Sequence, residues 1–548
     1  MDAWKHPFSR WPGDPVDPIA YMWSLGWSAH AIDTGTSPLH SDFLNYPRGF
    51  NTVWGGVLPL SGMLAWPAVH LGGVIWAYNV ALSVAVATAA WAAYLAARRL
   101  TSGLAPALVA GMVYGFGPFV VDQARAHLNL AFAIVPPLLL LLLHEVLVRQ
   151  RWAWWGAGAA LGATYAAQFF LAQEVMVSTL LAAVVGSAVL LVCARPGVPA
   201  RAPYARRALG LAALVAIATL AFPLGYEFFG PDPFPRGGTV QASHLYVTDL
   251  LAFVVPTDLF LVAPRSFAAL ASRFPGNPEE WTGYLGIPLL LLITQTVVRH
   301  RRDPAVVVLT VLLLLFAVLS LGPELVVAGR HTGVPLLWQF ERVPILGNVL
   351  PARLMMLADL AAAMLAAIAV ASMAAAPRRA RVAGGALLAV VLLSLAPSWP
   401  FPSATVGVPA YFSHPGTLSE GAVVVVLPYA TGSESDEAML WQLSASMRFK
   451  MPEGYFQSAD PDGRPRKGPD PTALGGAFQS IQYHGIDPGM DDVSRARYRA
   501  DLRGWGAGRI ILGPMRERQR MLAFITWLTG ARPTTEGGVE SWALSSPP

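Results

Sequence analysis

Long apolar stretches constrain this chain more than any other feature of its sequence. Between about residue 74 and residue 398, runs of about 20 apolar residues recur, each long enough to cross a hydrocarbon core of roughly 30 Å. Hydrophobic residues make up 54% of the chain and charged residues 13%, and the mean hydropathy is +0.48. The sequence therefore predicts a polytopic α-helical membrane protein with about ten spans. We place these spans at roughly 74–97, 103–121, 129–148, 153–172, 175–193, 208–226, 284–299, 304–321, 354–375 and 383–398.

Arginines mark every second junction between the apolar stretches. Because basic loops tend to stay in the cytoplasm, these junctions are predicted to be cytoplasmic, and the alternate junctions and the residues after 400 extracytoplasmic. An even number of spans that ends outside also begins outside, yet residues 1–12 contain no signal peptide, so we expect a further helix upstream. The basic junctions contain Arg98 and Arg99; Arg149 and Arg151; Arg195, Arg201, Arg206 and Arg207; Arg299, Arg301 and Arg302; and Arg378, Arg379 and Arg381.

Several function classes are excluded by composition and motifs. Cys193 is the only cysteine, so neither an intramolecular disulfide nor a thiolate metal cluster can form. The net charge of +5 comes from arginines at membrane junctions, which argues against nucleic-acid binding. The sequence contains no P-loop, GxSxG, HExxH or helix-opening GxGxxG motif, which argues against ATP hydrolysis and a primary pump.

Two carboxylates precede the first apolar stretch, in the sequence WPGDPVDPIAYMW (residues 11–23). Asp17 followed by Pro18 is typical of a helix start, where Asp17 would be an N-cap and Asp14 a turn residue. A chemical role is the alternative, because a carboxylate at the membrane interface can accept a proton from a hydroxyl group. Two carboxylates could also share a divalent cation.

The residues after Pro18 predict an interfacial helix. Trp23 and Trp27 recur at helical spacing among apolar residues, as in helices that lie on a membrane surface. A second interfacial or re-entrant segment is expected at 53–71, broken by Pro59 and Pro67.

Short motifs in this region resemble those of the GT-C superfamily of integral-membrane glycosyltransferases. The resemblance rests on GDPVDPIAYMWSLGW, YPRGFN, and AYNVAL opening a span that ends in ARRLT, and in architecture it covers roughly residues 12–400. It implies a sugar donor carried on polyprenyl phosphate and an aspartate in the first extracytoplasmic loop as catalytic base. Asp14 and Asp17 both match that position. The lack of a first transmembrane helix departs from the family pattern.

Other candidate site residues lie in the predicted extracytoplasmic loops. Arg125 and His127 could bind the phosphate of a donor, although a lone histidine is more often an interfacial hydrogen-bonding group. Glu174, within apolar sequence, is either functional or in a salt bridge with a neighbouring helix. Arg353 opens a span on the outer side, as a phosphate ligand or a snorkelling arginine. Glu280, beside Glu279, could cap a helix or contact substrate.

The residues after the apolar region have the patterns of a soluble domain. GAVVVVLPYA and GRIILGP predict buried strands, and SDEAMLWQLSASMRF and RERQRMLAFITWLTG predict helices. This alternation predicts a small α/β domain, extracytoplasmic and covering 401–548, after a transmembrane GT-C-like domain of 1–400 whose catalytic loop is about 12–55. Trp441, Tyr455 and Phe456 are candidates for acceptor binding.

These patterns together predict a multi-pass plasma-membrane glycosyltransferase, inverting, with its active site outside the cytoplasm. Its partners would be a polyprenyl-phosphate-linked sugar, membrane lipid, and a glycan, glycolipid or protein acceptor. Nothing in the sequence requires a cofactor, and a divalent metal is compatible with the paired carboxylates. A transporter or flippase of lipid-linked sugars, and a non-catalytic assembly partner, are the alternative functions.

Overall fold

The computed structural model describes residues 2–193, 198–235, 237–338, 343, 346–414, 418–460 and 462–544. The chain forms two compact units. The first contains Met1–Lys5, Asn79–Phe222 and Gln241–Ser403, and the second contains His6–Tyr78, Pro223–Val240 and Ala404–Pro548. Arg195, which belongs to a predicted basic junction, lies outside the described residues.

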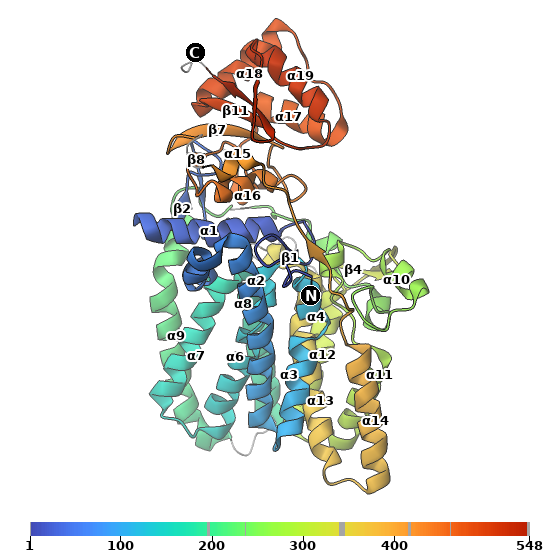
Figure 1. The fold of residues 1–548 in the computed structure, drawn as a ribbon. Coiled ribbons are helices and arrows are strands. Elements are labelled where there is room, and N and C mark those ends of the chain that lie inside the picture. Colours follow the sequence, from blue (N-terminus) through green and yellow to red (C-terminus); the bar gives the residue numbers. More distant parts are fainter. Residues whose placement is uncertain are drawn as a thin grey trace. The chain divides into compact units, whose positions relative to one another are not determined.

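The first unit is a bundle of long helices that run side by side (Figure 1). Each predicted span coincides largely with one to three of these helices. The two longest, α2 and α9, extend into the second unit at one end. The helices are α2 (Pro59–Leu100), α3 (Leu104–Gly115), α4 (Pro118–Gln123), α5 (Leu128–Ala131), α6 (Val135–His144), the π-helix η1 (Glu145–Arg149), α7 (Trp154–Leu171), α8 (Gln173–Cys193), α9 (Val198–Phe229), α10 (Arg265–Ala271), α11 (Ile287–His300), α12 (Pro304–Ser320), α13 (Met355–Met373) and α14 (Arg378–Ser394).

Some of the described helices are long and apolar enough to cross a membrane. By length and composition there are five, and three shorter apolar helices accompany them. The architecture is therefore helical and membrane-like, while the number of ten crossings stays a prediction. The five are Pro59–Leu100, Leu128–Arg149, Gln173–Cys193, Ala200–Phe229 and Pro351–Met373; the shorter ones are Leu104–Gly115, Ile287–His300 and Pro304–Ser320.

Helix α13 forms the core of the first unit. All its residues from Met355 to Ala367 are buried, and it packs against α3, α11 and α12. Its sequence, MMLADLAAAMLAAIAVASM, is rich in alanine, whose small side chain lets helix backbones approach closely. An apolar helix that is buried on all sides is expected to lie at the centre of a bundle.

Short elements connect the helices of the first unit. Two of them, η5 and η8, carry residues of a candidate site. The strands β4 and β5 form an antiparallel hairpin. These elements are the 3₁₀ helices η3 (Ser243–Leu245), η4 (Leu250–Phe253), η5 (Pro278–Glu280), η7 (Leu346–Asn348) and η8 (Pro351–Leu354), and the strands β4 (Glu324–Val327) and β5 (Arg330–Pro335).

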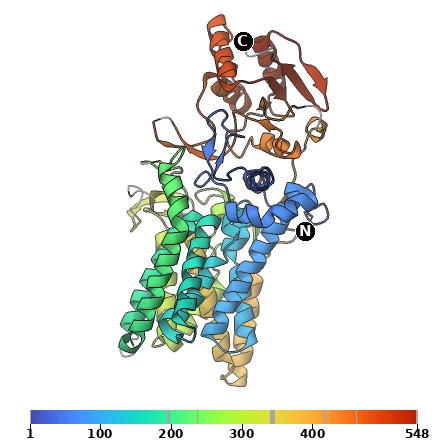
Figure 2. The ribbon, with the colours of Figure 1, turned by 90° about the vertical axis from the view of Figure 1, so that its left-hand side faces the viewer.

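A five-stranded sheet with order β12-β13-β11-β7-β8 organises the second unit (Figure 2). Strand β7 pairs in parallel with β11 and β8, while β13 pairs antiparallel with β11 and β12. The strands and helices predicted from the sequence after residue 420 are all present, and α19 ends at Gly530 in a left-handed conformation. The sheet strands are β7 (Ala422–Leu427), β8 (Phe449–Lys450), β11 (Arg509–Leu512), β12 (Thr534–Glu536) and β13 (Val539–Ala543).

Further elements of the second unit come from both ends of the chain. The N-terminal helix α1 packs against α16, and β2 pairs with β3. These elements are α1 (Pro18–Thr34), α15 (Ala410–Ser413), α16 (Glu437–Ser444), α17 (Ala473–His484), α18 (Asp492–Trp505), α19 (Arg518–Thr529), and the short strands β1 (Trp11–Pro12), β2 (His40–Ser41), β3 (Phe50–Asn51), β6 (Ser403–Ala404), β9 (Gln457–Ala459) and β10 (Pro465–Lys467).

The tryptophans that suggested an interfacial first helix are buried in the second unit, while the position of this helix relative to a membrane stays a prediction. Trp23 and Trp27 are only 2% and 3% exposed, and their rings stack on each other. The indole Nε1 of Trp23 donates to Gln442 Oε1 of α16 at 2.7 Å. The tryptophan spacing that suggested a membrane surface instead serves packing inside the second unit.

Of the two breaks predicted in the segment 53–71, only the one at Pro67 is wrong. Helix α2 begins at Pro59 and continues through Pro67, and its non-helical residue is Gly73, with φ +77°. A positive φ of this kind is accessible to glycine without steric cost.

Candidate functional site

Helix α1 presents Asp17 at its first turn. The helix begins at Pro18, as predicted, and Asp17 occupies the N-cap position. Its backbone has φ +67°, however, and its side chain makes no capping hydrogen bond. A non-glycine residue in this conformation is strained, and such residues cluster at functional sites. The carboxylate therefore does not satisfy the helix amides as an N-cap would.

The phenolic hydroxyl of Tyr455 donates a hydrogen bond to Asp17. Burial, together with the charge of Asp17, raises the pKa of Tyr455 well above its ordinary value, so the phenol keeps its proton. Tyr21 and Tyr78 lie within electrostatic range of the same pair. Asp17 thus has a neutral donor that stabilises its ionised form.

A second carboxyl group, Asp436, belongs to the same cluster. It precedes α16, is 1% exposed, and its Oδ2 has no hydrogen-bond partner among the described residues. Burial raises the pKa of Asp436 well above the usual range, and the charges of Glu437 and Asp17 act in the same direction. Two carboxyl groups with such different surroundings are the pattern by which proteins keep one acid protonated and its neighbour ionised. Asp436 was not predicted as a site residue, since SDEAML is typical of an ordinary acidic helix start.

Asp14 has a different environment from Asp17. It is partly exposed, and its backbone carbonyl accepts a hydrogen bond from Trp11 Nε1 at 2.9 Å. The sequence could not separate the two aspartates. In the structure, the hydroxyl group of Tyr455 and the carboxyl group of Asp436 are neighbours of Asp17.

Arg353 of η8 forms the centre of an ion-pair network in the first unit. Its Nη1 lies 2.6 Å from Glu174 Oε1, and its Nε lies 2.9 Å from Glu280 Oε1, which also pairs with Nη2. The side chains of Arg353 and Glu280 are 14% and 1% exposed. Three predicted site residues are thus brought together, and all three guanidinium nitrogens of Arg353 contact carboxylates.

His127 belongs to the edge of this network. Its Nδ1 lies 2.7 Å from Gln123 Oε1 and 3.9 Å from Glu280 Oε1. Gln123 in turn donates to the backbone carbonyl of Glu279 at 2.8 Å. Arg125, from the same loop, is 9% exposed and lies within electrostatic range of Asp122.

Two further carboxyl groups are buried nearby in the first unit. Neither oxygen of Asp122 has a hydrogen-bond partner among the described residues, and Asp359 Oδ2 accepts from the backbone amide of Phe119 at 3.1 Å. Asp359 was missed, although a single acidic residue inside an apolar helix is a recognisable functional signal.

A metal ion would need several carboxylate, histidine or cysteine side chains directed at one point. Within the described residues, no group of three or more histidine, cysteine, aspartate or glutamate side chains is arranged to hold one. Asp17 has a hydrogen bond from Tyr455, and Asp436 is buried.

Comparisons with known proteins give similarity only at the level of structure. No protein-family model matches the sequence, and no curated protein is significantly similar. The arabinofuranosyltransferase AftD from Mycobacteria matches with a TM-score of 0.59 and 15% identity, over 96% of this chain and 39% of AftD. A mutant AftD structure matches with a TM-score of 0.54 and 14% identity, over 98% and 40%. The oligosaccharyltransferase AglB from Archaeoglobus fulgidus, in complex with an inhibitory peptide and a dolichol-phosphate, has a TM-score of 0.46 and 11% identity, over 95% and 68%.

The AftD comparison defines the class of fold. This chain shares its fold with the arabinofuranosyltransferase AftD and spans about two fifths of the length of AftD. The architecture that the sequence motifs indicated is therefore confirmed at the level of the fold.

Proposed function

We propose that this chain is an inverting membrane glycosyltransferase that moves a sugar from a polyprenyl-phosphate donor to a hydroxyl group outside the cytoplasm. The observation that carries the proposal is the hydrogen bond from Tyr455 to Asp17, in a chain with a GT-C fold. The acceptor would be a cell-envelope glycan, a glycolipid or a protein. No nucleotide is required, because the lipid phosphate is itself the leaving group.

Asp17 is the general base in this mechanism. Its carboxylate removes the proton from the acceptor hydroxyl as the acceptor oxygen forms a bond to the anomeric carbon of the donor sugar. The bond from that carbon to the phosphate oxygen breaks on the opposite face, and the lipid phosphate leaves with the electron pair. Tyr455 is a positioning residue, since its hydroxyl group donates to Asp17 and thereby favours the ionised form of that carboxylate.

Within the first unit, Arg125 and His127 are the proposed phosphate-binding residues, as the sequence predicted. Arg353 already has two carboxylate partners, so binding phosphate there would require one of them to be displaced. Glu174 and Glu280 therefore hold Arg353 in place in this proposal. Arg125 is a cation in a nearly buried loop and can form charge-assisted hydrogen bonds with phosphate oxygens.

The test is transfer of a labelled sugar by the purified full-length protein in lipid nanodiscs. A panel of polyprenyl-phosphate sugars would be supplied as donors, and membrane glycans as acceptors. Wild type would be compared with Asp17→Asn, Asp14→Asn and the surface control Asp492→Asn, whose side chain is fully exposed. We expect Asp17→Asn to lower kcat by about 10²–10⁴-fold, the usual contribution of a general base.

Each result bears on the proposal. Loss in Asp17→Asn alone supports it, whereas loss in Asp14→Asn alone moves the base to Asp14. Wild-type protein that moves lipid-linked sugar between leaflets of a vesicle, without transferring sugar from any donor, would replace the enzyme by the alternative flippase function.

A further inference from the structure

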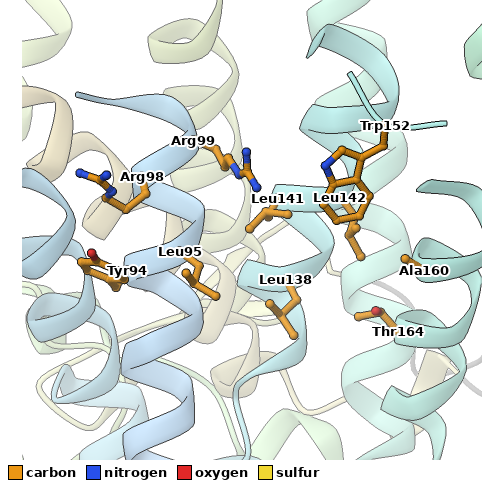
Figure 3. A pocket seen from close by; sticks show the side chains of 10 residues that line it. All are labelled: Tyr94, Leu95, Arg98, Arg99, Leu138, Leu141, Leu142, Trp152, Ala160 and Thr164. Carbon is orange, nitrogen blue, oxygen red and sulfur yellow. The ribbon is translucent and has the colours of Figure 1, made fainter. Parts of the chain in front are cut away.

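A cavity of about 580 Å³ opens between α2, α6 and α7 of the first unit. Leu95, Leu138, Leu141 and Leu142 form an apolar wall, and Ala160 and Thr164 of α7 lie opposite. Figure 3 shows Arg98, Arg99 and Trp152 toward one end of this cavity, with the guanidinium group of Arg98 turned away from Trp152, and Leu138, Ala160 and Thr164 toward the other end. Its volume is within the roughly 300–1,000 Å³ typical of small-molecule sites.

The two arginines are uncompensated cations. Arg98 and Arg99 are in the last turn of α2, are exposed, and form no ion pair with any carboxylate in the described parts of the chain. Glu145, an acidic residue near this end, is 2% exposed, and its Oε1 accepts instead from the backbone amides of Arg151 and Trp152 at 2.5 and 2.9 Å. The pocket therefore offers two positive charges to a ligand.

Trp152 is held in place at the cavity mouth. Its amide is bound by Glu145, and its carbonyl accepts a hydrogen bond from the hydroxyl of Tyr204 at 2.8 Å. Trp152, Trp154 and Trp155 are 40%, 38% and 62% exposed, although each is a large apolar side chain. Exposed tryptophans beside exposed arginines mark the level of lipid headgroups.

We propose that this cavity binds an anionic glycerophospholipid from the leaflet that it faces. Arg98 and Arg99 bind the phosphodiester, Trp152 contacts the headgroup region, and the leucines of α2 and α6 contact the upper acyl chains. Charge complementarity selects this occupant, because an apolar pocket with two unpaired guanidinium groups at one end matches an apolar tail joined to an anion. The inference does not depend on the proposed sugar transfer.

The test is lipid binding to the full-length protein, measured by native mass spectrometry from detergent. The probes are phosphatidylglycerol and phosphatidylcholine with identical acyl chains. Near an anionic membrane surface each basic residue contributes roughly fivefold to affinity, so the double variant Arg98→Gln/Arg99→Gln should bind phosphatidylglycerol about 25-fold more weakly. The matched control is Arg378→Gln/Arg379→Gln, two adjacent exposed arginines at the start of α14.

A second variant tests the cavity independently of charge. Ala160→Phe would fill the apolar part, so binding of both lipids should fall while the unfolding temperature stays near wild type. Equal wild-type affinity for the two lipids, an equal loss in the Arg378/Arg379 control, or no effect of Ala160→Phe in a folded protein would each overturn the proposal. Selective binding of a polyprenyl phosphate in place of phosphatidylglycerol would overturn it as well.

Discussion

Tyr455 donates a hydrogen bond to Asp17, although the two residues come from opposite ends of the chain. The second unit makes this contact because α1 packs directly against α16. A Cβ atom on Gly26 of α1 would lie 2.2 Å from Leu443 Cδ2, so the helices approach as closely as glycine allows. The environment of Asp17 is therefore completed by C-terminal residues.

Replacing Tyr455 by Phe tests that relationship. The substitution removes only the hydroxyl group, so the ionised form of Asp17 loses a donor while packing is preserved. We expect kcat to fall about tenfold, in line with the loss of a hydrogen bond to a charged group, roughly 1.5 kcal/mol. The acid limb of the kcat/KM pH profile should move to higher pH, because Asp17 would then hold its proton more tightly.

Tyr483→Phe provides the matched control for this measurement. Tyr483 also makes hydroxyl hydrogen bonds in the second unit, but with Thr431 and Ser435. A pH profile that moves equally in both variants, or in neither, would contradict the role given to Tyr455.

The buried carboxyl group of Asp436 should make the stability of the folded protein depend on pH. Burial raises the pKa of this carboxyl group in the folded protein, above a value near 4 in the unfolded chain. The protonated carboxyl group therefore makes its full contribution to the free energy of unfolding below about pH 4. This contribution is lost as the pH rises through the pKa that Asp436 has in the folded protein. Asp436→Asn cannot ionise, so its unfolding temperature should rise relative to wild type between about pH 4 and pH 8. Tryptophan fluorescence during heating would measure the two unfolding temperatures. If the difference between variant and wild type stayed the same across this pH range, the prediction would be refuted.

The helices and strands of the chain could be predicted from local sequence patterns, whereas the contacts of the candidate site residues could not. Apolar run length located the helices, and β-branched residues located β7 and β11, because these signals come from neighbours in sequence. Trp23 and Trp27 gave the right helix and the wrong surroundings, since α16 covers them. Periodicity shows that one face is apolar, whereas only tertiary structure shows what covers it.

The polar residues illustrate the same limit. The sequence could single out three charged residues because they lie close to apolar sequence: Glu174, Glu280 and Arg353. An ionisable side chain in such surroundings costs free energy unless it is paired. Their mutual neutralisation depends on three separate elements that meet in the first unit. Asp436 and Tyr455 carry no such local signal, so their relation to Asp17 was not predictable.

The Arg353 network predicts an order of destabilisation. Two carboxylates contact one guanidinium, so Arg353→Gln leaves Glu174 and Glu280 facing each other without a counter-ion. We expect a loss of about 3–5 kcal/mol in the free energy of unfolding. Glu280→Gln should cost less, about 1–3 kcal/mol, because Glu174 still neutralises Arg353. Arg330→Gln, at an exposed position of β5, is the control, and urea unfolding in micelles would measure all three. An effect of Arg353→Gln no larger than that of the control would contradict the network's role in stability.

Replacing Gly115 of α3 by alanine should change the stability of the protein in the opposite direction to the same replacement at Gly210 of α9. Gly111 and Gly115 are four residues apart and both face Ala90 of α2. A Cβ atom on Gly115 would lie 2.3 Å from the Ala90 Cβ and 2.6 Å from its backbone nitrogen, so the two helices would have to separate. Gly115→Ala should therefore destabilise the first unit by about 1–3 kcal/mol, the usual cost of overpacking. At Gly210 of α9 an added Cβ meets no atom within 4 Å, so Gly210→Ala should instead stabilise the helix by up to about 1 kcal/mol. Unfolding temperatures of the two variants that shift in the same direction would show that the close approach of α2 and α3 does not limit stability.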